Sequence, residues 1–457
     1  MEENRSEFLS TSMPKLFWKY ALLALVGVMF SCLAVILDGF FMGNGVGPMA
    51  LAAIAVAVTM MYFGLGLSQM LGSGASTLAG IKLGDGDEDG ARDVYGTSIV
   101  FTIIITVIIS VLCLVFMKPL LYFLGATDEV YPYAADYARV FFIMFPVSML
   151  GQVAYYFCRL AERPKAAAVF FVAGGLGAIL VEYILVFKLH FGTAASAWDF
   201  VIGIAATVFL IPYLQMTKNK FKLTKSNLKL NFGYVIEMIK IGFPMFLFNL
   251  CPLITTVIIN NQIIAQGGND LHLAAFGIFN AYVVYVMNAM ASAFTVGLQP
   301  IASVNYGAKA FNRVRSLIKV SIPQSFIVLL VVQICVLIFA KPIVAFFAGG
   351  AGELTDITTS AMRINILLFA FGSVATLVGG YYIGIEKNGL AILNSTTRVL
   401  IFAVPLLFIL PSIMGLTGVW AAQPFADACA CVLAVICIVH EYRQLGKKDN
   451  EMLSERR

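Results

Sequence analysis

Apolar runs long enough to cross a lipid bilayer recur along almost the whole chain, and they constrain its fold more than any other feature. A helix needs about 20 mostly apolar residues to cross ~30 Å of hydrocarbon. Runs of this kind cover residues 16–43, 50–81, 94–117, 130–158, 166–187 and 193–216 and, after a polar gap, 233–265, 271–305, 315–340, 354–385, 389–412 and 416–440. Hydrophobic residues make up 60% of the 457 positions and charged residues only 12%, which excludes a water-soluble globular protein. The sequence therefore predicts an all-α membrane protein with about twelve transmembrane helices.

Lysine and arginine residues are distributed unevenly between the loops. Positive charges in short loops favour the cytoplasmic side of a membrane. On alternate loops, beginning after the second run, they are Lys82, Arg92, Arg159, Arg163, Lys165, Lys218, Lys220, Lys222, Lys225, Lys229, Lys309, Arg313, Arg315, Lys319 and Lys387. The opposite side has Lys118, Lys188 and Lys341, or five such residues if Arg139 and Arg363 are included. We therefore expect the first set of loops and both termini to be cytoplasmic. The net charge of +5 reflects this orientation and requires no nucleic-acid partner.

The two halves of the sequence repeat each other at an offset of about 223 residues. Lys118-Pro119 matches Lys341-Pro342 at a helix start, and Gly84 matches Gly307 at a helix end. Because each half has an even number of spans, both copies insert with the same orientation, and a pseudo-twofold axis should lie along the membrane normal. The predicted domains are an N-terminal six-helix lobe (1–216), a cytoplasmic interlobe linker (217–232), a C-terminal six-helix lobe (233–440) and a cytoplasmic tail (441–457).

Four stretches of the sequence together carry a family resemblance. They are LDGFFMG (37–43), IKLGDGD (81–87), GLQPIASVNYGA (297–308), and GVW with PFAD (418–420 and 424–427). In this order they resemble the multidrug and toxic compound extrusion (MATE) transporters, particularly the bacterial branches, over nearly the whole chain. The resemblance implies two lobes that alternate access to a central cavity. It also implies export of amphipathic, often cationic compounds across the plasma membrane, driven by inward flow of sodium ions or protons.

Acidic residues inside the predicted spans are candidates for binding the coupling ion. A charged group in the bilayer core costs a few kcal/mol, so its presence there points to function. Asp38, Glu182 and Asp199 each lie roughly 8 to 12 Å below the outer surface at 1.5 Å per residue. We expect one carboxylate cluster in the first lobe. Such a cluster can hold a proton near neutral pH and release it when the cavity opens, or its oxygens can hold a sodium ion.

The resemblance bears on the choice between these two ions. The ion site of MATE relatives matches Asp38 and Glu182, together with an asparagine one turn before the second acid and a threonine on the sixth helix. The last two positions are Ala178 and Phe200 here, while Asp199 is an additional acid. The loss of two neutral oxygen ligands favours protons, although sodium at Asp38 and Glu182 stays an alternative. Asp199 has the further alternative of capping a helix start.

Polar and aromatic residues elsewhere in the spans are candidates for the substrate cavity. Asparagine and glutamine bond across helices or line cavities, and aromatic faces and thioethers attract organic cations. The candidates are Tyr62, Gln69, Asn260, Asn261, Tyr282, Tyr285, Met287 and Gln299. Arg398 and Asp427 lie at comparable depths in the second lobe, where they are expected to neutralise each other as an ion pair between neighbouring helices.

The leading hypothesis is an antiporter, and its closest rival is a flippase for lipid-linked oligosaccharides, which shares this fold. A cavity rich in arginine and lysine would favour the flippase, but Arg398 is the one basic residue deep in a predicted span. No zinc signature or nucleophile motif suggests an enzyme, and no cofactor is expected. An ion channel would assemble symmetric selectivity rings from several chains, whereas this chain already contains its own twofold repeat. The expected partners are a small-molecule substrate, a proton or sodium ion and the bilayer, and we expect a monomer.

Overall fold

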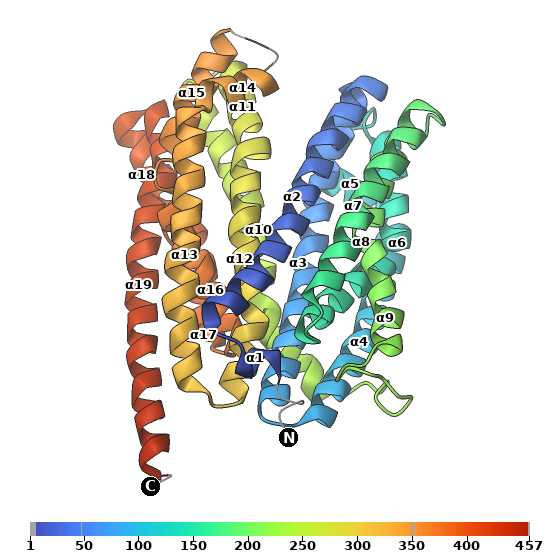
Figure 1. Cartoon of the computed structure of the whole chain (residues 1–457). Helices are drawn as coiled ribbons and strands as arrows, with labels where there is room; N and C mark the ends of the chain where they lie inside the picture. The colour runs from blue at the N-terminus through green and yellow to red at the C-terminus, as the bar shows by residue number, and fades with distance from the viewer. Residues whose placement is uncertain (1–5, 47, 349, 351, 456–457) are drawn as a thin grey trace. The chain divides into compact units, whose positions relative to one another are not determined.

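The computed structural model describes residues 6–46, 48–348, 350 and 352–455, and all elements in these ranges are helical (Figure 1). In the first half they are α1 (Glu7–Ser10), α2 (Met13–Gly45), α3 (Pro48–Gly84), α4 (Glu88–Val115), α5 (Met117–Phe123), α6 (Tyr131–Leu160), α7 (Pro164–Phe187), α8 (Ala194–Ala205), η1 (Ala206–Phe209) and α9 (Leu210–Met216). Of these, η1 is a 3-10 helix that joins α8 to α9 without a break. The predicted all-α class is confirmed.

The second half repeats the pattern with more irregular helices. Its elements are α10 (Phe232–Ala265), α11 (Asp270–Ile278), η2 (Phe279–Val284), α12 (Tyr285–Gly307), α13 (Phe311–Ile338), α14 (Ala340–Phe347), α15 (Glu353–Asn365), α16 (Phe369–Gly384), α17 (Asn388–Thr396), η3 (Thr397–Ala403), α18 (Val404–Met414) and α19 (Leu416–Glu455). Both η2 and η3 are π-helical segments inside longer helices. Such segments are rare and frequently occur at functional sites.

The helices agree closely with the predicted spans. Within the described residues, ten helices are long and apolar enough to cross a membrane, and the bent pair α15 and α16 makes eleven. The remaining expected span is α3, whose 37 residues exceed the required length, although part of its side chains lies outside the described residues. The largest differences are at the ends. Helix α4 begins earlier than expected because Asp87 caps it by accepting a hydrogen bond from the Gly90 amide, and α19 continues to Glu455 through the expected tail.

The chain forms two compact units. The first comprises residues 1–10, 22–249 and 307–309, and the second comprises 11–21, 250–306 and 310–457. The division passes through α2 and α10, so the start of α2 packs with the second unit and the start of α10 packs with the first. The lobe boundaries at 216 and 233 stay a prediction.

The starts of α2 and α10 pack closely against glycines of other helices, and these glycines occupy equivalent positions of the internal repeat. In the first unit, a Cβ on Gly74 of α3 would lie 2.0 Å from the Met238 carbonyl oxygen of α10, and one on Gly242 would lie 1.9 Å from the Met70 carbonyl oxygen. In the second unit, a Cβ on Gly297 of α12 would lie 3.0 Å from the Cα atom of Ala21 in α2. Gly74 and Gly297 are related by the offset of about 223 residues, so the internal repeat extends to helix packing.

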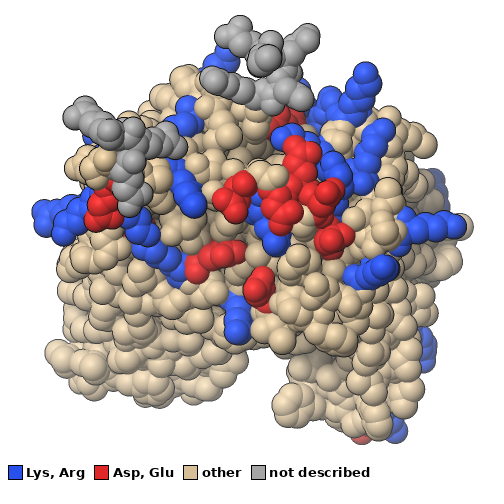
Figure 2. Space-filling view, turned by 90° about the horizontal axis from the view of Figure 1, so that it is seen from below, with Lys and Arg blue, Asp and Glu red and all other residues tan. Residues whose placement is uncertain are grey.

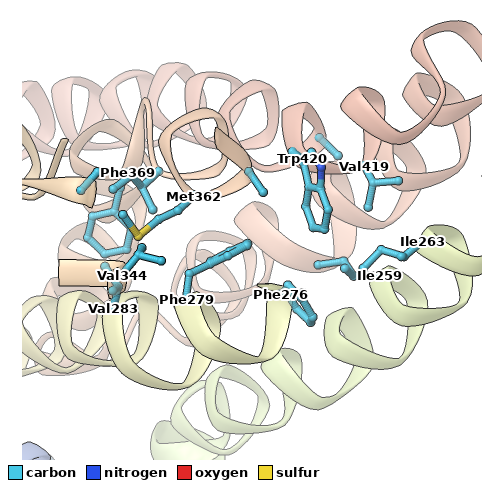
Figure 3. Packing of buried hydrophobic residues seen from close by; sticks show 14 of the residues in the cluster. Ile259, Ile263, Phe276, Phe279, Val283, Val344, Met362, Phe369, Val419 and Trp420 are labelled. Atoms are coloured by element: carbon cyan, nitrogen blue, oxygen red, sulfur yellow. The ribbon is translucent and has the colours of Figure 1, made fainter. Parts of the chain in front are cut away.

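The second unit has a continuous apolar core, shown in Figure 3. Phe276 and Phe279 project from α11 and η2 towards Trp420 of α19, with ring centroids 6.4 and 5.9 Å from its ring. Beside this core the span formed by α15 and α16 is bent by 52°. The buried Gln333 of α13 bridges the bend, because its amide donates to the Leu367 carbonyl at 2.6 Å and accepts from the Ala370 amide at 2.7 Å. Backbone groups released by a helix break inside a membrane need such partners.

Candidate functional site

The three predicted acids of the first lobe come together inside the first unit. They project from α2 (Asp38), α7 (Glu182) and α8 (Asp199). The Asp38 carboxyl lies within hydrogen-bonding reach of Glu182 and of Ser196, and both Glu182 and Asp199 interact electrostatically with it. Acids far apart in the sequence therefore form one cluster, as the depth calculation predicts.

Burial differs among the three carboxyl groups. Glu182 is 0% exposed and Asp199 is 7% exposed, whereas Asp38 is partly exposed. Within the described part of the chain, both Glu182 oxygens and one oxygen each of Asp38 and Asp199 are inaccessible and receive no hydrogen bond. Asp38 faces Glu182, but two ionised carboxylates have no proton to place between them. The cluster is thus a group of carboxylates in which several acceptor oxygens receive no hydrogen bond, although the Ser196 hydroxyl is within reach of Asp38.

Tyr137 of α6 completes this cluster, and the sequence reasoning did not single it out. Its buried hydroxyl interacts electrostatically with Asp38, Asp199 and Glu182, and it has no hydrogen-bond partner among the residues described. Its ring stacks on Phe141 with centroids 6.1 Å apart. The available sequence signal was its position within the 130–158 run, but aromatic residues are too common in such runs to mark one of them.

Small and aromatic residues pack the helices around the acids. Gly45 of α2 lies against Val186 of α7, and Ala195 of α8 joins their apolar contact. The two positions that hold oxygen ligands in the resembled family serve packing here. Ala178 is 1% exposed and lies against Gly203, and the Phe200 ring lies 5.7 Å from that of Phe141. No group of three or more His, Cys, Asp or Glu residues suited to a metal ion occurs in the described ranges.

The candidate cavity residues divide between the two units. In the first unit Tyr62 is half-buried, and Gln69 accepts a hydrogen bond from Asn249 at 3.2 Å. The other six candidates belong to the second unit. Asn260, Tyr282 and Tyr285 are half-buried, Asn261 is exposed, Met287 belongs to the apolar core, and Gln299 is 1% exposed.

Two of the second unit's candidates have informative surroundings. The Tyr282 ring stacks on Phe347 with centroids 4.4 Å apart, so that face of the ring is already covered. Neither side-chain amide atom of Gln299 has a hydrogen-bond partner in the described part of the molecule. Met287 is 2% exposed and packs in the apolar core, so its side chain does not face a cavity in this structure.

Arg398 and Asp427 form a buried ion pair in the second unit. The Arg398 Nε and Nη2 atoms donate to the two Asp427 oxygens at 2.6 and 3.2 Å, and Nη1 donates to Asn288 at 2.9 Å. Gln423 adds a further hydrogen bond to Asp427 at 2.9 Å. The guanidinium also lies 4.7 Å from the Phe369 ring centroid. Arg398 belongs to the π-helical segment η3, and its contacts join η3 to α12, α16 and α19.

Comparison with known proteins identifies the family. The model of the MatE family matches residues 23–184 and 241–410, one segment in each half and together well over half of the chain. The chain belongs to the MATE family. The predicted resemblance is confirmed, and membership makes the protein a multi-pass transporter of the plasma membrane and not an enzyme. Asp38, Glu182 and Arg398 lie inside the matched segments of this MATE chain, whereas Asp199 and Asp427 lie outside them.

Curated relatives and solved structures match almost the full length. The chain is 22% identical to the multidrug export protein MepA of Staphylococcus saprophyticus, over 99% of each chain. It is 25% identical to MepA of Staphylococcus aureus strain MSSA476, over 96% of each. An outward-facing multidrug resistance MATE transporter superposes with a TM-score of 0.91 at 19% identity, covering 97% of this chain and 100% of that one. A MATE crystal structure in the straight conformation gives 0.89 at 20%, covering 96% and 98%.

Proposed function

We propose that this MATE protein is a secondary active antiporter that exports amphipathic, often cationic small molecules in exchange for protons by alternating access. The observation that carries the proposal is the donor-poor cluster of Asp38, Glu182 and Asp199 inside the first unit. The export of drugs by the MepA relatives supports small organic molecules as the cargo. Buried polar groups are normally satisfied, so a buried set of acceptors calls for an exchangeable positive partner.

A proton fits the chemistry of this cluster better than a sodium ion. One proton shared between Asp38 and Glu182 converts two facing acceptors into a donor and an acceptor. A hard cation prefers several oxygen ligands, and the packed side chains of Ala178 and Phe200 supply none. We therefore assign the coupling role to protons, with sodium at Asp38 and Glu182 as the alternative that the transport test must exclude.

Asp38 is the member of the cluster through which protons enter and leave. Its residue is partly exposed, whereas Glu182 is 0% exposed. A proton on this pair removes the repulsion between two buried negative charges, so protonation stabilises a state in which the cluster is closed from water. Binding and release then shift the equilibrium between outward-facing and inward-facing states, which is the requirement for coupled exchange.

Replacing Asp38 tests the proposed role. We expect Asp38→Asn to reduce the transport of a fluorescent organic cation into everted vesicles to background, while membrane insertion and amount are unchanged. Asp136→Asn serves as a matched control, because this exposed acid pairs with Arg139 on the surface of α6. Full transport by Asp38→Asn would defeat the proposal.

The coupling ion is tested by driving the transport of one organic cation with an imposed pH gradient, with and without sodium. Proton coupling predicts transport that follows the pH gradient and does not respond to sodium. Stimulation by a sodium gradient at constant pH would overturn the proton assignment.

The flippase alternative has less support. Arg398 would have to be available for an anionic lipid-linked sugar, but Asp427, Asn288 and Phe369 surround its guanidinium. Removing one partner of such a buried pair would leave an uncompensated charge. The monomeric state and the lack of a nucleic-acid partner stay predictions.

A further inference from the structure

Helix α19 continues well past the length that is needed to cross a membrane. Its 40 residues extend roughly 60 Å at 1.5 Å per residue, whereas the hydrocarbon core is about 30 Å thick. The α19 extension comprises residues 441–455, which the sequence predicts as a cytoplasmic tail. In the structure these residues continue the helix, and their side chains contact other elements of the second unit. The α19 extension is therefore a packed part of that unit.

A buried ion pair attaches the α19 extension to the turn between α16 and α17. The Lys387 ammonium of this turn donates to the Glu441 carboxylate and lies 3.4 Å from the Gln444 side-chain oxygen. The Glu441 side chain is 2% exposed, so water and salt screen the pair little. One turn earlier on α19, the Cys437 carbonyl accepts a hydrogen bond from the Tyr382 hydroxyl of α16 at 2.9 Å. Removing one partner of the ion pair would leave a buried charge without compensation.

Contacts between cations and aromatic rings attach the α19 extension to α12 and α13. The Lys448 ammonium lies 5.9 Å from the ring centroid of Tyr306, at the end of α12, and 5.7 Å from that of Phe311, at the start of α13. The Arg315 guanidinium of α13 lies 4.3 Å from the Tyr442 ring centroid. Such contacts are attractive because the face of an aromatic ring is electron-rich. The extension thus joins the end of α12, the start of α13 and the turn after α16.

The turn that contains Lys387 has a counterpart in the first half of the chain. Glu386 and Glu162 both have a left-handed backbone, with φ of +58° and +62°, and they are related by the repeat offset of about 223 residues. Each is followed by a basic residue, Lys387 or Arg163. Residues other than glycine rarely adopt this conformation, so its occurrence at both positions shows that the repeat includes these turns.

The segments that follow the last span of each half are equivalent as well. In the first unit, Arg163 donates to the Lys218 carbonyl of the interlobe linker at 3.2 Å, and Lys218 corresponds to Glu441 in the repeat. The linker packs with Phe221, which is 0% exposed, and the α19 extension packs with Leu445 at the corresponding position, which is 1% exposed. In each half, a basic turn and one buried apolar residue therefore hold the segment in place.

We propose that the α19 extension is a clamp of the second unit, which keeps the ends of α12, α13 and α16 together while the transporter changes between its two states. Alternating access in transporters built from repeats consists largely of one repeat rocking against the other as a rigid body. Chain ends outside the hydrocarbon stay ordered only where contacts hold them. Lys387 and Glu441 are the positioning residues of this clamp. The inference does not depend on which ion drives transport.

Charge reversal at the ion pair tests the clamp by hydrogen–deuterium exchange of the full-length protein in detergent. The variants are Lys387→Glu, Glu441→Lys and the double variant that carries both changes. Each single reversal places like charges side by side, so we expect exchange in peptides 380–392 and 441–455 to rise at least about tenfold. The double variant restores the pair with its charges exchanged and should return exchange to within about twofold of the wild type. Lys447→Glu is the matched control, because this exposed lysine lies on the same extension and should leave exchange unchanged.

Transport and local exchange together decide the outcome. We expect each single reversal to lower the initial rate of organic-cation uptake into everted vesicles about fivefold at equal protein amount, with recovery in the double variant. Exchange in the equivalent turn of the first unit, residues 158–168, should not change. A single variant that fails to fold while the double variant folds supports the pairing.

Several results would overturn the clamp. They are unchanged exchange in the single variants, a double variant that exchanges as fast as either of them, and faster exchange together with full transport. A wild type that does not transport organic cations would count against the proposed antiport, whereas the exchange measurements would still test the clamp.

Discussion

Glu182 and Asp427 are equally buried carboxylates whose hydrogen-bond partners differ. Each is 0% exposed. Asp427 accepts hydrogen bonds from Arg398 and Gln423, so its charge is balanced within the second unit. Neither oxygen of Glu182 receives a hydrogen bond from any described residue. We therefore expect the Asp427 arrangement to stabilise one conformation, and under the proposed antiport Glu182 is the acid whose charge changes during the cycle.

Tyr137 provides a prediction at the scale of single residues. Tyr137→Phe removes the hydroxyl beside the three acids but keeps the ring that stacks on Phe141. The hydroxyl makes no hydrogen bond to a described residue in this structure, but a hydrogen bond that it donates to one of the carboxylates during the cycle would contribute about 1.5–3 kcal/mol, so we expect transport to fall roughly tenfold and its pH profile to shift. The measurement is the initial rate of cation uptake into everted vesicles as a function of pH. A rate and pH profile like those of the wild type would show that the hydroxyl has no part in ion coupling.

At the scale of helices, the span formed by α15 and α16 is broken by a bend, and the Gln333 side chain stabilises this bend. Its amide substitutes for backbone partners on both sides of the bend between α15 and α16. Gln333→Ala leaves the Leu367 carbonyl and the Ala370 amide without this partner. An unsatisfied buried group costs about 1–3 kcal/mol, so we expect a clearly lower midpoint of thermal unfolding in detergent.

A neighbouring substitution controls for simple loss of side-chain volume on α13. Ile334 follows Gln333 directly, is 46% exposed, and should tolerate replacement by alanine with little change in the unfolding midpoint. Equal stability of Gln333→Ala and Ile334→Ala would contradict the role assigned to the amide.

Helices α3 and α10 pack closely where Gly74 and Gly242 lie against the opposite backbone, and this contact gives a second prediction for helices. Gly74→Ala or Gly242→Ala places a methyl group about 2 Å from a carbonyl oxygen of the opposite helix, so the helices must separate. Overpacking of this kind costs about 1–3 kcal/mol, and we expect reduced stability and transport.

Gly177→Ala is the matched control for this crossing, because a Cβ at Gly177 meets nothing within 4 Å on α7. Alanine there should raise stability by about 0.5–1 kcal/mol through its better helix propensity. Similar unfolding midpoints for Gly74→Ala and Gly177→Ala would rule out the close crossing.

At the scale of the whole molecule, the charged residues of the loops bear on the orientation of the chain in the membrane. Figure 2 shows lysine, arginine and acidic side chains on the face viewed from below. The loop 217–231 lies between spans and contains five lysines, at positions 218, 220, 222, 225 and 229. By the positive-inside rule these lysines predict cytoplasmic termini, and this orientation stays a prediction.

Reporter fusions test this orientation. A green fluorescent protein fused after residue 457 should fluoresce, because it folds in the cytoplasm, and alkaline phosphatase at the same point should be inactive. Fusions after residue 190, in the loop between α7 and α8, should give the reverse result. Active alkaline phosphatase at the C-terminus would invert the topology.

Much of the fold was predictable because the signals are local. Run length predicted the span positions to within a few residues for most helices, and the repeat predicted two matching sets of helices. The acids Asp38, Glu182 and Asp199 were found from their cost in a membrane, and Arg398 and Asp427 from their matching depth. Tyr137 and Gln333 were missed, since nothing in their local sequence separates them from ordinary residues of a span.

The sequence by itself determined the number, length and order of the helices, because crossing hydrocarbon requires about 20 apolar residues whatever the neighbours are. Only the tertiary structure decided which buried polar groups are satisfied. Asp427 has donors and Glu182 has none among the described residues, although both are acids in apolar runs. Hydrogen-bond partners come from other helices, so this distinction depends on how helices pack and not on the run that contains each acid.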